Sequence, residues 1–191
     1  MVTNKLEAVK ALGQALWLDY IRKDLISSGE LQKLIIEDGI SGITSNPAIF
    51  QQAISGSEFY DDEIAKLVQE GLSEKNIYER LSQQDVQAAA DLLFPVYQQT
   101  NCKDGFVSLE VNPHFANSLE KTLTEARNLW KSLDRPNVLI KIPATEVGLR
   151  SIKTLISEGI NINVTLLFSL ARYREVAEAY IEGIEKRLAQ G

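Results

Sequence analysis

A lysine lies inside an apolar run of the sequence, Val138-Leu139-Ile140-Lys141-Ile142-Pro143. The density of valine, leucine and isoleucine predicts a buried strand, and the proline marks the point where the strand ends. Burial favours the neutral amine over the ammonium, and a neutral amine is a nucleophile whose natural partner is a carbonyl carbon. On these residues alone two interpretations of Lys141 stay open: a nucleophile for imine chemistry, or a strand-end lysine whose ammonium reaches out to water.

Each of the five predicted strands finishes with a polar residue; in chain order these are Asp19, Asn46, Glu110, Lys141 and Thr165. Because the carboxyl ends of all strands converge on one mouth in an α/β barrel, these groups are expected to lie together. One amine, two carboxylates, an amide and a hydroxyl are the groups that imine chemistry on a polyol needs. Structural roles also stay open: Asp19 as a turn cap, Asn46 before a proline as a turn, Glu110 as an ion-pair partner of Lys141, and Thr165 as a backbone-bonding hydroxyl.

The segments that must position these groups alternate between short apolar runs and longer stretches of helical periodicity. This alternation predicts βαβ units and a parallel sheet. The one-faced helices include 119–133, a helix begun by Thr145 and ended by Gly159, and 170–188. The predicted strands are Ala15–Asp19, Gly42–Asn46, Phe106–Glu110, Val138–Ile142 and Ile160–Thr165.

Capping signals predict where two further helices begin. Ser27-Ser28-Gly29-Glu30 has the form of a capping box, and the helix after it is expected to end at Gly39. Ser82-Gln83-Gln84-Asp85 has a looser form of the same signal. The connection from Asn46 to Phe106 is about twice the length of a minimal crossover, so we expect it to hold two or three helices.

The composition limits the classes of function. Residues 1–191 are long enough for one domain with a core and are predicted to form a single domain. The net charge of −6 and the lack of a basic patch argue against a nucleic-acid or anionic-membrane partner. No apolar stretch approaches the about 20 residues needed to cross a bilayer, and no secretory pattern is present, so a cytoplasmic location is expected. One cysteine, Cys102, and one histidine, His114, cannot build a usual metal site, so we expect no metal and no cofactor.

Two long motifs resemble the signatures of the transaldolase family. Gly42-Ile43-Thr44-Ser45-Asn46-Pro47-Ala48-Ile49-Phe50 is similar to the first signature. The run from Val138 to Thr145, continued by Glu146-Val147-Gly148-Leu149, is similar to the second, which surrounds the Schiff-base lysine. The resemblance covers essentially the whole chain. The segments that resemble the family's first, third and fifth strands are Leu16–Asp19, Ser108–Val111 and Asn161–Ser169.

The resemblance implies a class I, metal-free transfer of a three-carbon dihydroxyacetone unit in the pentose phosphate pathway. The donor would be a ketose phosphate such as sedoheptulose 7-phosphate or fructose 6-phosphate. The acceptor would be an aldose phosphate such as glyceraldehyde 3-phosphate or erythrose 4-phosphate. Sugar phosphates are therefore the expected partners.

The resemblance also implies a role for each site residue. Lys141 would form the imine, and Asp19 would take the proton from the C4 hydroxyl as the C3–C4 bond breaks. Glu110, with Thr165 and a water between them, would handle protons when the imine forms and hydrolyses. The residues expected to hold substrate hydroxyls and line the same mouth are Asn46, Thr44 and Asn163.

The fold that the resemblance implies is an α/β fold, a (β/α)8 barrel of the TIM type, with about the first five β/α units in this chain. The family's phosphate-holding serine and arginine follow the fifth unit, so they would lie beyond residue 191. A further segment or a second copy would then complete the barrel. Two alternatives to a transaldolase stay open: a class I aldolase that releases free dihydroxyacetone, and an inactive fragment that acts only as a structural partner domain.

Overall fold

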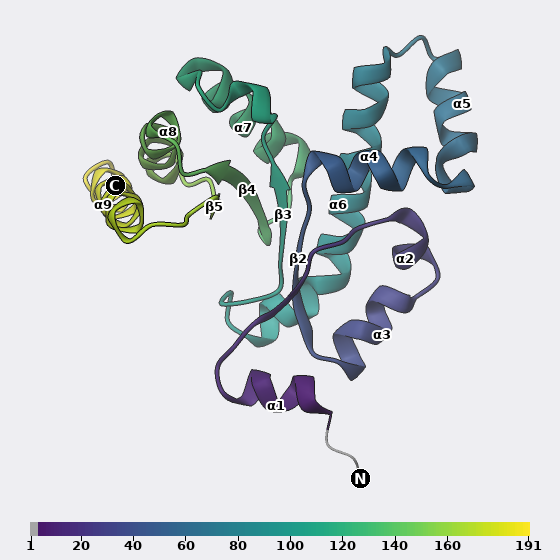
Figure 1. Ribbon diagram of the computed structural model, residues 1–191, viewed down its shortest axis with the longest axis horizontal. Coiled ribbons are helices and arrows are strands. Elements are labelled where there is room, and N and C mark those ends of the chain that lie inside the picture. Colours follow the sequence, from purple (N-terminus) through teal and green to yellow (C-terminus); the bar gives the residue numbers. More distant parts are fainter. Residues whose placement is uncertain (1–3) are drawn as a thin grey trace. The chain divides into compact units, whose positions relative to one another are not determined.

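The computed structural model describes residues 4–191, in which five strands alternate with helices along the chain (Figure 1). The strand order is sequential, β1-β2-β3-β4-β5, and the β1–β2 and β4–β5 pairs are parallel. Strands in chain order with helical crossovers are typical of the first part of a (β/α)8 barrel, so the predicted fold class is confirmed. The strands are β1 (Leu16–Leu18), β2 (Ile40–Thr44), β3 (Phe106–Glu110), β4 (Val138–Pro143) and β5 (Ile162–Thr165).

Helices fill the connections between the strands. Three α-helices lie between β2 and β3, as the length of that connection predicts. Within residues 4–191, no helix is both long enough and apolar enough to cross a membrane. The α-helices are α1 (Lys5–Ala11), α2 (Lys23–Ser27), α3 (Glu30–Glu37), α4 (Pro47–Ser55), α5 (Asp61–Gln69), α6 (Glu74–Gln99), α7 (Leu119–Leu133), α8 (Glu146–Ser157) and α9 (Leu170–Leu188), and the 3-10 helices are η1 (Glu58–Tyr60) and η2 (Pro113–Phe115).

The chain divides into two compact units, and the first of them ends at Val107 inside β3. In this unit Trp17 of β1 pairs in register with Gly42 of β2. The indole of Trp17 occupies the place where a Cβ of residue 42 would stand, because an ideal Cβ there would lie 2.3 Å from the ring. Only glycine therefore fits at this position of β2. A core cluster formed by η1, α5 and α6 contains Tyr60, Leu67, Ile77 and Leu81.

The second unit runs from Ser108 to Gly191 and contains the parallel pair β4–β5. Helices α8 and α9 pack side by side in this unit (Figure 1). They approach each other closely at Gly183 of α9, where an added Cβ would lie 2.8 Å from the Cβ of Ile156. One turn later the guanidinium of Arg187 covers Gly159, the left-handed residue that ends α8 as predicted.

The structure corrects the predicted bounds of four strands, although β4 differs only by the addition of Pro143. β2 covers Ile40–Thr44 rather than 42–46, because Asn46 is the N-cap of α4 and its Oδ1 accepts a hydrogen bond from the N–H of Ile49 at 3.0 Å. Asp19 likewise follows β1, which ends at Leu18, and β5 begins at Ile162 rather than 160. In β1 and β2 the polar end of the predicted run thus lies beyond the strand.

Both predicted capping boxes are wrong. Ser27 is the last residue of α2, and the next helix, α3, begins after Gly29, which has a left-handed φ of 82°. Ser82 lies inside the long helix α6, whose N-cap is Ser73, because apolar residues continue the helical period on both sides of it. The predicted cap at Thr145 is confirmed, since its Oγ1 accepts a hydrogen bond from the N–H of Gly148 at 2.9 Å.

Candidate active site

Strand β4 places Lys141 on the face of the sheet opposite its most buried residues. Val138, Ile140 and Ile142 are fully buried, and side chains along a strand alternate between its two faces. Lys141 therefore shares the other face with Leu139. The backbone around it is held on both sides, because its carbonyl accepts a hydrogen bond from the N–H of Val111 at 3.1 Å and the residue pairs in register with Asn163.

The carboxylate of Glu110 lies beside this lysine. Its Oε2 is 3.5 Å from the Nζ of Lys141, and the two side chains are only 13% and 12% exposed. Glu110 is the last residue of β3, the strand next to β4 in the sheet. A carboxylate at the end of β3 and an amine within the second half of β4 are thus brought together, as the sequence predicts for this pair.

Burial raises the pKa of Glu110 above its ordinary value, and the neighbouring ammonium of Lys141 offsets only part of that effect. Removing a carboxyl from water disfavours its charged form, while a nearby positive charge favours it. Glu110 therefore keeps a proton to higher pH than an exposed glutamate does. A carboxyl that retains its proton in this way can act as a proton donor as well as an acceptor.

Strand β5 adds two of the predicted residues to the same unit. Its register pairs Asn163 with Lys141 and Thr165 with Pro143, so both follow the face that carries the lysine. The Nδ2 of Asn163 donates a hydrogen bond of 2.7 Å to the Oγ of Ser108, a buried residue of β3. The second unit therefore holds an amine, a carboxyl, a carboxamide and two hydroxyls on adjoining strands.

The other predicted residues belong to the first unit, where each has its own surroundings. Asp19 is exposed directly after β1, and Thr44 is half-buried as the last residue of β2. Asn46 is half-buried, and because its Oδ1 caps α4, its Nδ2 is the atom that can donate to a ligand. These positions are compatible with binding and proton transfer at strand ends.

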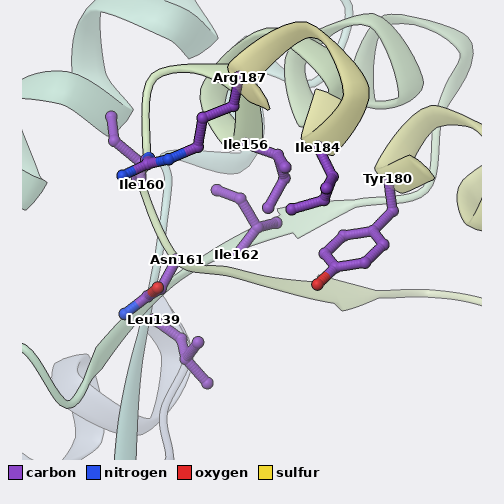
Figure 2. A pocket seen from close by; sticks show the side chains of 9 residues that line it. Leu139, Ile156, Ile160, Asn161, Ile162, Tyr180, Ile184 and Arg187 are labelled. Carbon is purple, nitrogen blue, oxygen red and sulfur yellow. The ribbon is translucent and has the colours of Figure 1, made fainter. Parts of the chain in front are cut away.

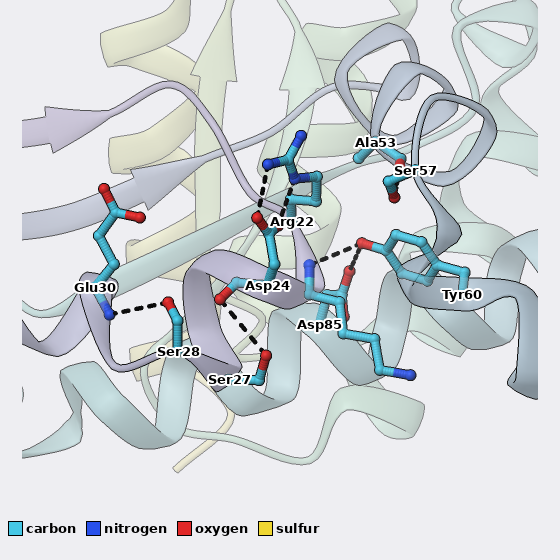
Figure 3. A network of polar contacts seen from close by, with 10 residues as sticks. Arg22, Asp24, Ser27, Ser28, Glu30, Ala53, Ser57, Tyr60 and Asp85 are labelled. Carbon is cyan, nitrogen blue, oxygen red and sulfur yellow. Dashed lines mark hydrogen bonds and ion pairs between the residues drawn. The ribbon is translucent and has the colours of Figure 1, made fainter.

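Sequence reasoning missed a buried polar network in the first unit (Figure 3). The hydroxyl of Tyr60 donates to the Oδ2 of Asp85 at 2.7 Å and accepts from the backbone N–H of Lys23 at 2.9 Å. Beside it, the guanidinium of Arg22 forms a bidentate ion pair with Asp24. No spacing in the sequence could reveal the Tyr60–Asp85 pair, because its partners are 25 residues apart.

Two features of the described residues bear on which ligands the chain could hold. Residues 4–191 contain no group of three or more histidine, cysteine, aspartate or glutamate side chains that could hold a metal. A cavity of about 330 Å³ lies beside β4, β5, α8 and α9 (Figure 2). Its polar lining comes from Asn161, Tyr180 and Arg187, and none of the predicted site residues lines it.

Comparison with known proteins assigns the chain to a family. Residues 16–189 match the Transaldolase/Fructose-6-phosphate aldolase family. The chain is 48% identical over 191 residues to Transaldolase 2 of Nostoc punctiforme, covering 100% of this chain and 50% of that protein. It is 47% identical over 188 residues to the transaldolase of Thiobacillus denitrificans, covering 98% of this chain and 52% of that protein.

A third relative is the transaldolase of Mycobacterium bovis, which is 45% identical over 186 residues, covering 97% of this chain and 50% of that protein. The chain thus spans about half the length of the curated relatives it matches. The matched part includes all five β/α units and both motifs around Asn46 and Lys141. The chain belongs to the transaldolase/fructose-6-phosphate aldolase family.

Proposed function

We propose that this chain carries the imine-forming part of a transaldolase, which moves a dihydroxyacetone unit from a ketose phosphate to an aldose phosphate. The observation that carries the proposal is the buried pair of Lys141 and Glu110, 3.5 Å apart, in a member of this family. A buried amine next to a carboxyl of raised pKa suits carbonyl chemistry, because the carboxyl can supply and remove the protons that the amine's reaction requires.

In the proposed reaction the Nζ of Lys141 attacks C2 of the donor ketose, and the carbonyl oxygen leaves as water with protons supplied through Glu110. The protonated imine then accepts the electron pair of the C3–C4 bond. Asp19 takes the proton of the C4 hydroxyl, and the shortened aldose phosphate departs. The enamine left on the lysine attacks the aldehyde of the acceptor, and hydrolysis of the new imine returns the free amine.

The remaining residues hold the sugar in this proposal. Thr165 works with Glu110 through a water, and the Nδ2 of Asn46 donates to a substrate hydroxyl and the enamine. Thr44 and Asn163 contact further hydroxyls. The family match supports these assignments. So do the positions of Thr44 and Thr165 at the ends of β2 and β5, of Asn46 just after β2, and of Asn163 within β5. We place the reaction in the cytoplasm and the pentose phosphate pathway, and we treat residues 1–191 as one domain of the barrel.

A fructose-6-phosphate aldolase is the second candidate, because the matched family includes that activity. The two activities separate by their need for an acceptor. A transaldolase supplied with fructose 6-phosphate and erythrose 4-phosphate forms sedoheptulose 7-phosphate and glyceraldehyde 3-phosphate, and it needs the acceptor to turn over. An aldolase forms free dihydroxyacetone and glyceraldehyde 3-phosphate from fructose 6-phosphate alone.

The test measures glyceraldehyde 3-phosphate with a coupled dehydrogenase, with and without erythrose 4-phosphate. Lys141→Met should abolish the signal, whereas Lys153→Met, at an exposed lysine paired with Glu182 on α9, should leave it unchanged. Release that is independent of the acceptor would favour the aldolase. A signal that survives in Lys141→Met would contradict both.

We also propose that a segment equivalent to the second half of the relatives covers the end of the second unit. The region after β5 exposes large apolar side chains, with Phe168 88% and Leu170 68% exposed. On α9 the residues Tyr173, Ile181 and Leu188 are exposed as well. A surface of this kind normally packs against other protein. Light scattering of the isolated chain should show association through this surface, which Phe168→Ser should weaken; a monodisperse monomer would contradict the proposal.

A further inference from the structure

The strands on the two sides of β4 are linked by a side-chain hydrogen bond. The Nδ2 of Asn163 in β5 donates to the Oγ of Ser108 in β3 at 2.7 Å, although the two residues are 55 positions apart. Ser108 is fully buried. A short bond between a buried hydroxyl and a half-buried carboxamide on different strands fixes the orientation of the carboxamide, because breaking it would leave the buried hydroxyl without this partner.

This bond lies on the face that carries Lys141 and Glu110. Ser108 shares that face with Glu110, because the two residues are two positions apart in β3. Asn163 shares it with Lys141, its register partner in the parallel β4–β5 pair. In β/α barrels, side chains from alternate strands form one layer and those from the intervening strands form the next. Ser108 of β3 and Asn163 of β5 come from alternate strands and so belong to one layer. Lys141 of the intervening strand β4 belongs to the next layer.

We infer that Ser108 is a positioning residue for the proposed reaction, and that it acts by orienting the carboxamide of Asn163. With Nδ2 bound to Ser108, the Oδ1 of Asn163 is the atom that can accept a hydrogen bond from a ligand. A hydroxyl of the ketose on Lys141 is a donor of that kind. By holding Nδ2, Ser108 leaves Oδ1 of Asn163 facing the ligand, and this oxygen can bind only a group that donates a hydrogen bond, such as a sugar hydroxyl.

This inference rests on the proposed imine chemistry of Lys141. Without Ser108 the carboxamide of Asn163 can rotate and offer either its oxygen or its NH2 group. Binding of the sugar must then fix the carboxamide as well. One neutral hydrogen bond of this kind corresponds to a change of roughly 3- to 10-fold in an equilibrium. The loss should appear as a higher half-saturating concentration of sugar, because Ser108 contacts the carboxamide of Asn163 and none of the reacting atoms.

The test is a double-mutant cycle with borohydride trapping of fructose 6-phosphate on Lys141 as the readout. Ser108→Ala should raise the half-saturating sugar concentration roughly 3- to 10-fold, and Asn163→Ala should raise it at least as much. The double variant should behave like Asn163→Ala alone, because Ser108 acts only through that carboxamide. Equal effects of Ser108→Ala in both backgrounds would overturn the inference.

The matched control is Ser151→Ala. Ser151 is also fully buried, and its hydroxyl donates to the carbonyl of Val147 within α8 at 2.9 Å. This variant should leave trapping unchanged. If wild-type protein forms no adduct on Lys141, the proposed function itself fails. If it forms the adduct and Ser108→Ala traps with the same half-saturating concentration, only the positioning role fails.

A second measurement needs no variant at position 108. The side-chain NH2 protons of Asn163 should exchange with solvent more slowly than those of Asn76, an exposed asparagine of α6. Nuclear magnetic resonance of 15N-labelled protein reports both side chains in one sample. Equally fast exchange at Asn163 and Asn76 would overturn the inference even if Ser108→Ala did not fold.

Discussion

Replacing Asp85 by asparagine should stabilise the protein at neutral pH. Asp85 is only 6% exposed on α6, and burial raises the pKa of its carboxyl to about 6 from an ordinary value of 3.8. The hydrogen bond from Tyr60 and the charge of Lys23 lower the pKa, while Glu63 and Asp24 raise it, but burial is the largest effect. An asparagine oxygen can accept the same hydrogen bond from Tyr60 without a charge to bury.

The raised pKa gives both the sign and the size of the effect. Between about pH 4 and pH 6 the folded protein binds more protons at this carboxyl than the unfolded chain does, so the free energy of unfolding falls as the pH rises. The contribution is fully present below 3.8 and is lost above about 6. The difference between these pKa values corresponds to about 3 kcal/mol in total, of which about 1.5 kcal/mol is lost between pH 5 and pH 8.

Urea unfolding of the wild type and Asp85→Asn at pH 5, 6, 7 and 8 measures this effect. The stability advantage of the variant should grow by about 1.5 kcal/mol over that range. Asp62→Asn, at an exposed carboxylate of α5, is the matched control and should show no such growth. An advantage of Asp85→Asn that stays constant from pH 5 to pH 8 would refute the reasoning.

Three further changes have defined outcomes. Gly183→Ala should lower the free energy of unfolding by about 1–3 kcal/mol in thermal or urea unfolding, because the new Cβ would lie 2.8 Å from the Cβ of Ile156. Inside a helix this change usually raises the free energy of unfolding, so a rise would contradict the close packing at Gly183. Thr145→Ala should cost about 1 kcal/mol in the same assay by removing the cap on Gly148, and no loss would show that the cap is dispensable. Glu110→Gln should slow imine trapping. Burial keeps a proton on Glu110 that rising pH removes, so the ratio of the wild-type rate to the variant rate should fall as the pH rises. A ratio that is independent of pH would contradict a role for Glu110 in proton transfer.

Strands β3 and β4, which carry Glu110 and Lys141, could be predicted from the sequence almost residue for residue. β3 has the predicted bounds, and β4 extends the predicted run only by Pro143, because a dense run of apolar β-branched residues has one favourable structure. Asn46 was harder to place. It has extended backbone angles, but it lies beyond the last paired residue of β2, and its side-chain oxygen caps the helix that follows.

What the sequence could not predict depends on contacts between distant residues. The capping signal at Ser82 has the right residue types, but α6 already runs through this position because its buried side packs along its length. The Tyr60–Asp85 and Ser108–Asn163 hydrogen bonds join residues 25 and 55 positions apart. Only the fold brings these partners together. Ser108 did carry one signal, since it lies two positions before Glu110 and so shares its face.

Borohydride reduction reveals whether Lys141 forms an imine with the donor sugar. The protein is incubated with fructose 6-phosphate, reduced, digested with trypsin and analysed by mass spectrometry. We expect a mass increment on the peptide that contains Lys141, with cleavage blocked at that residue, and no increment in Lys141→Met. An increment on any other lysine while Lys141 stays unmodified would show that Lys141 is not the imine-forming residue.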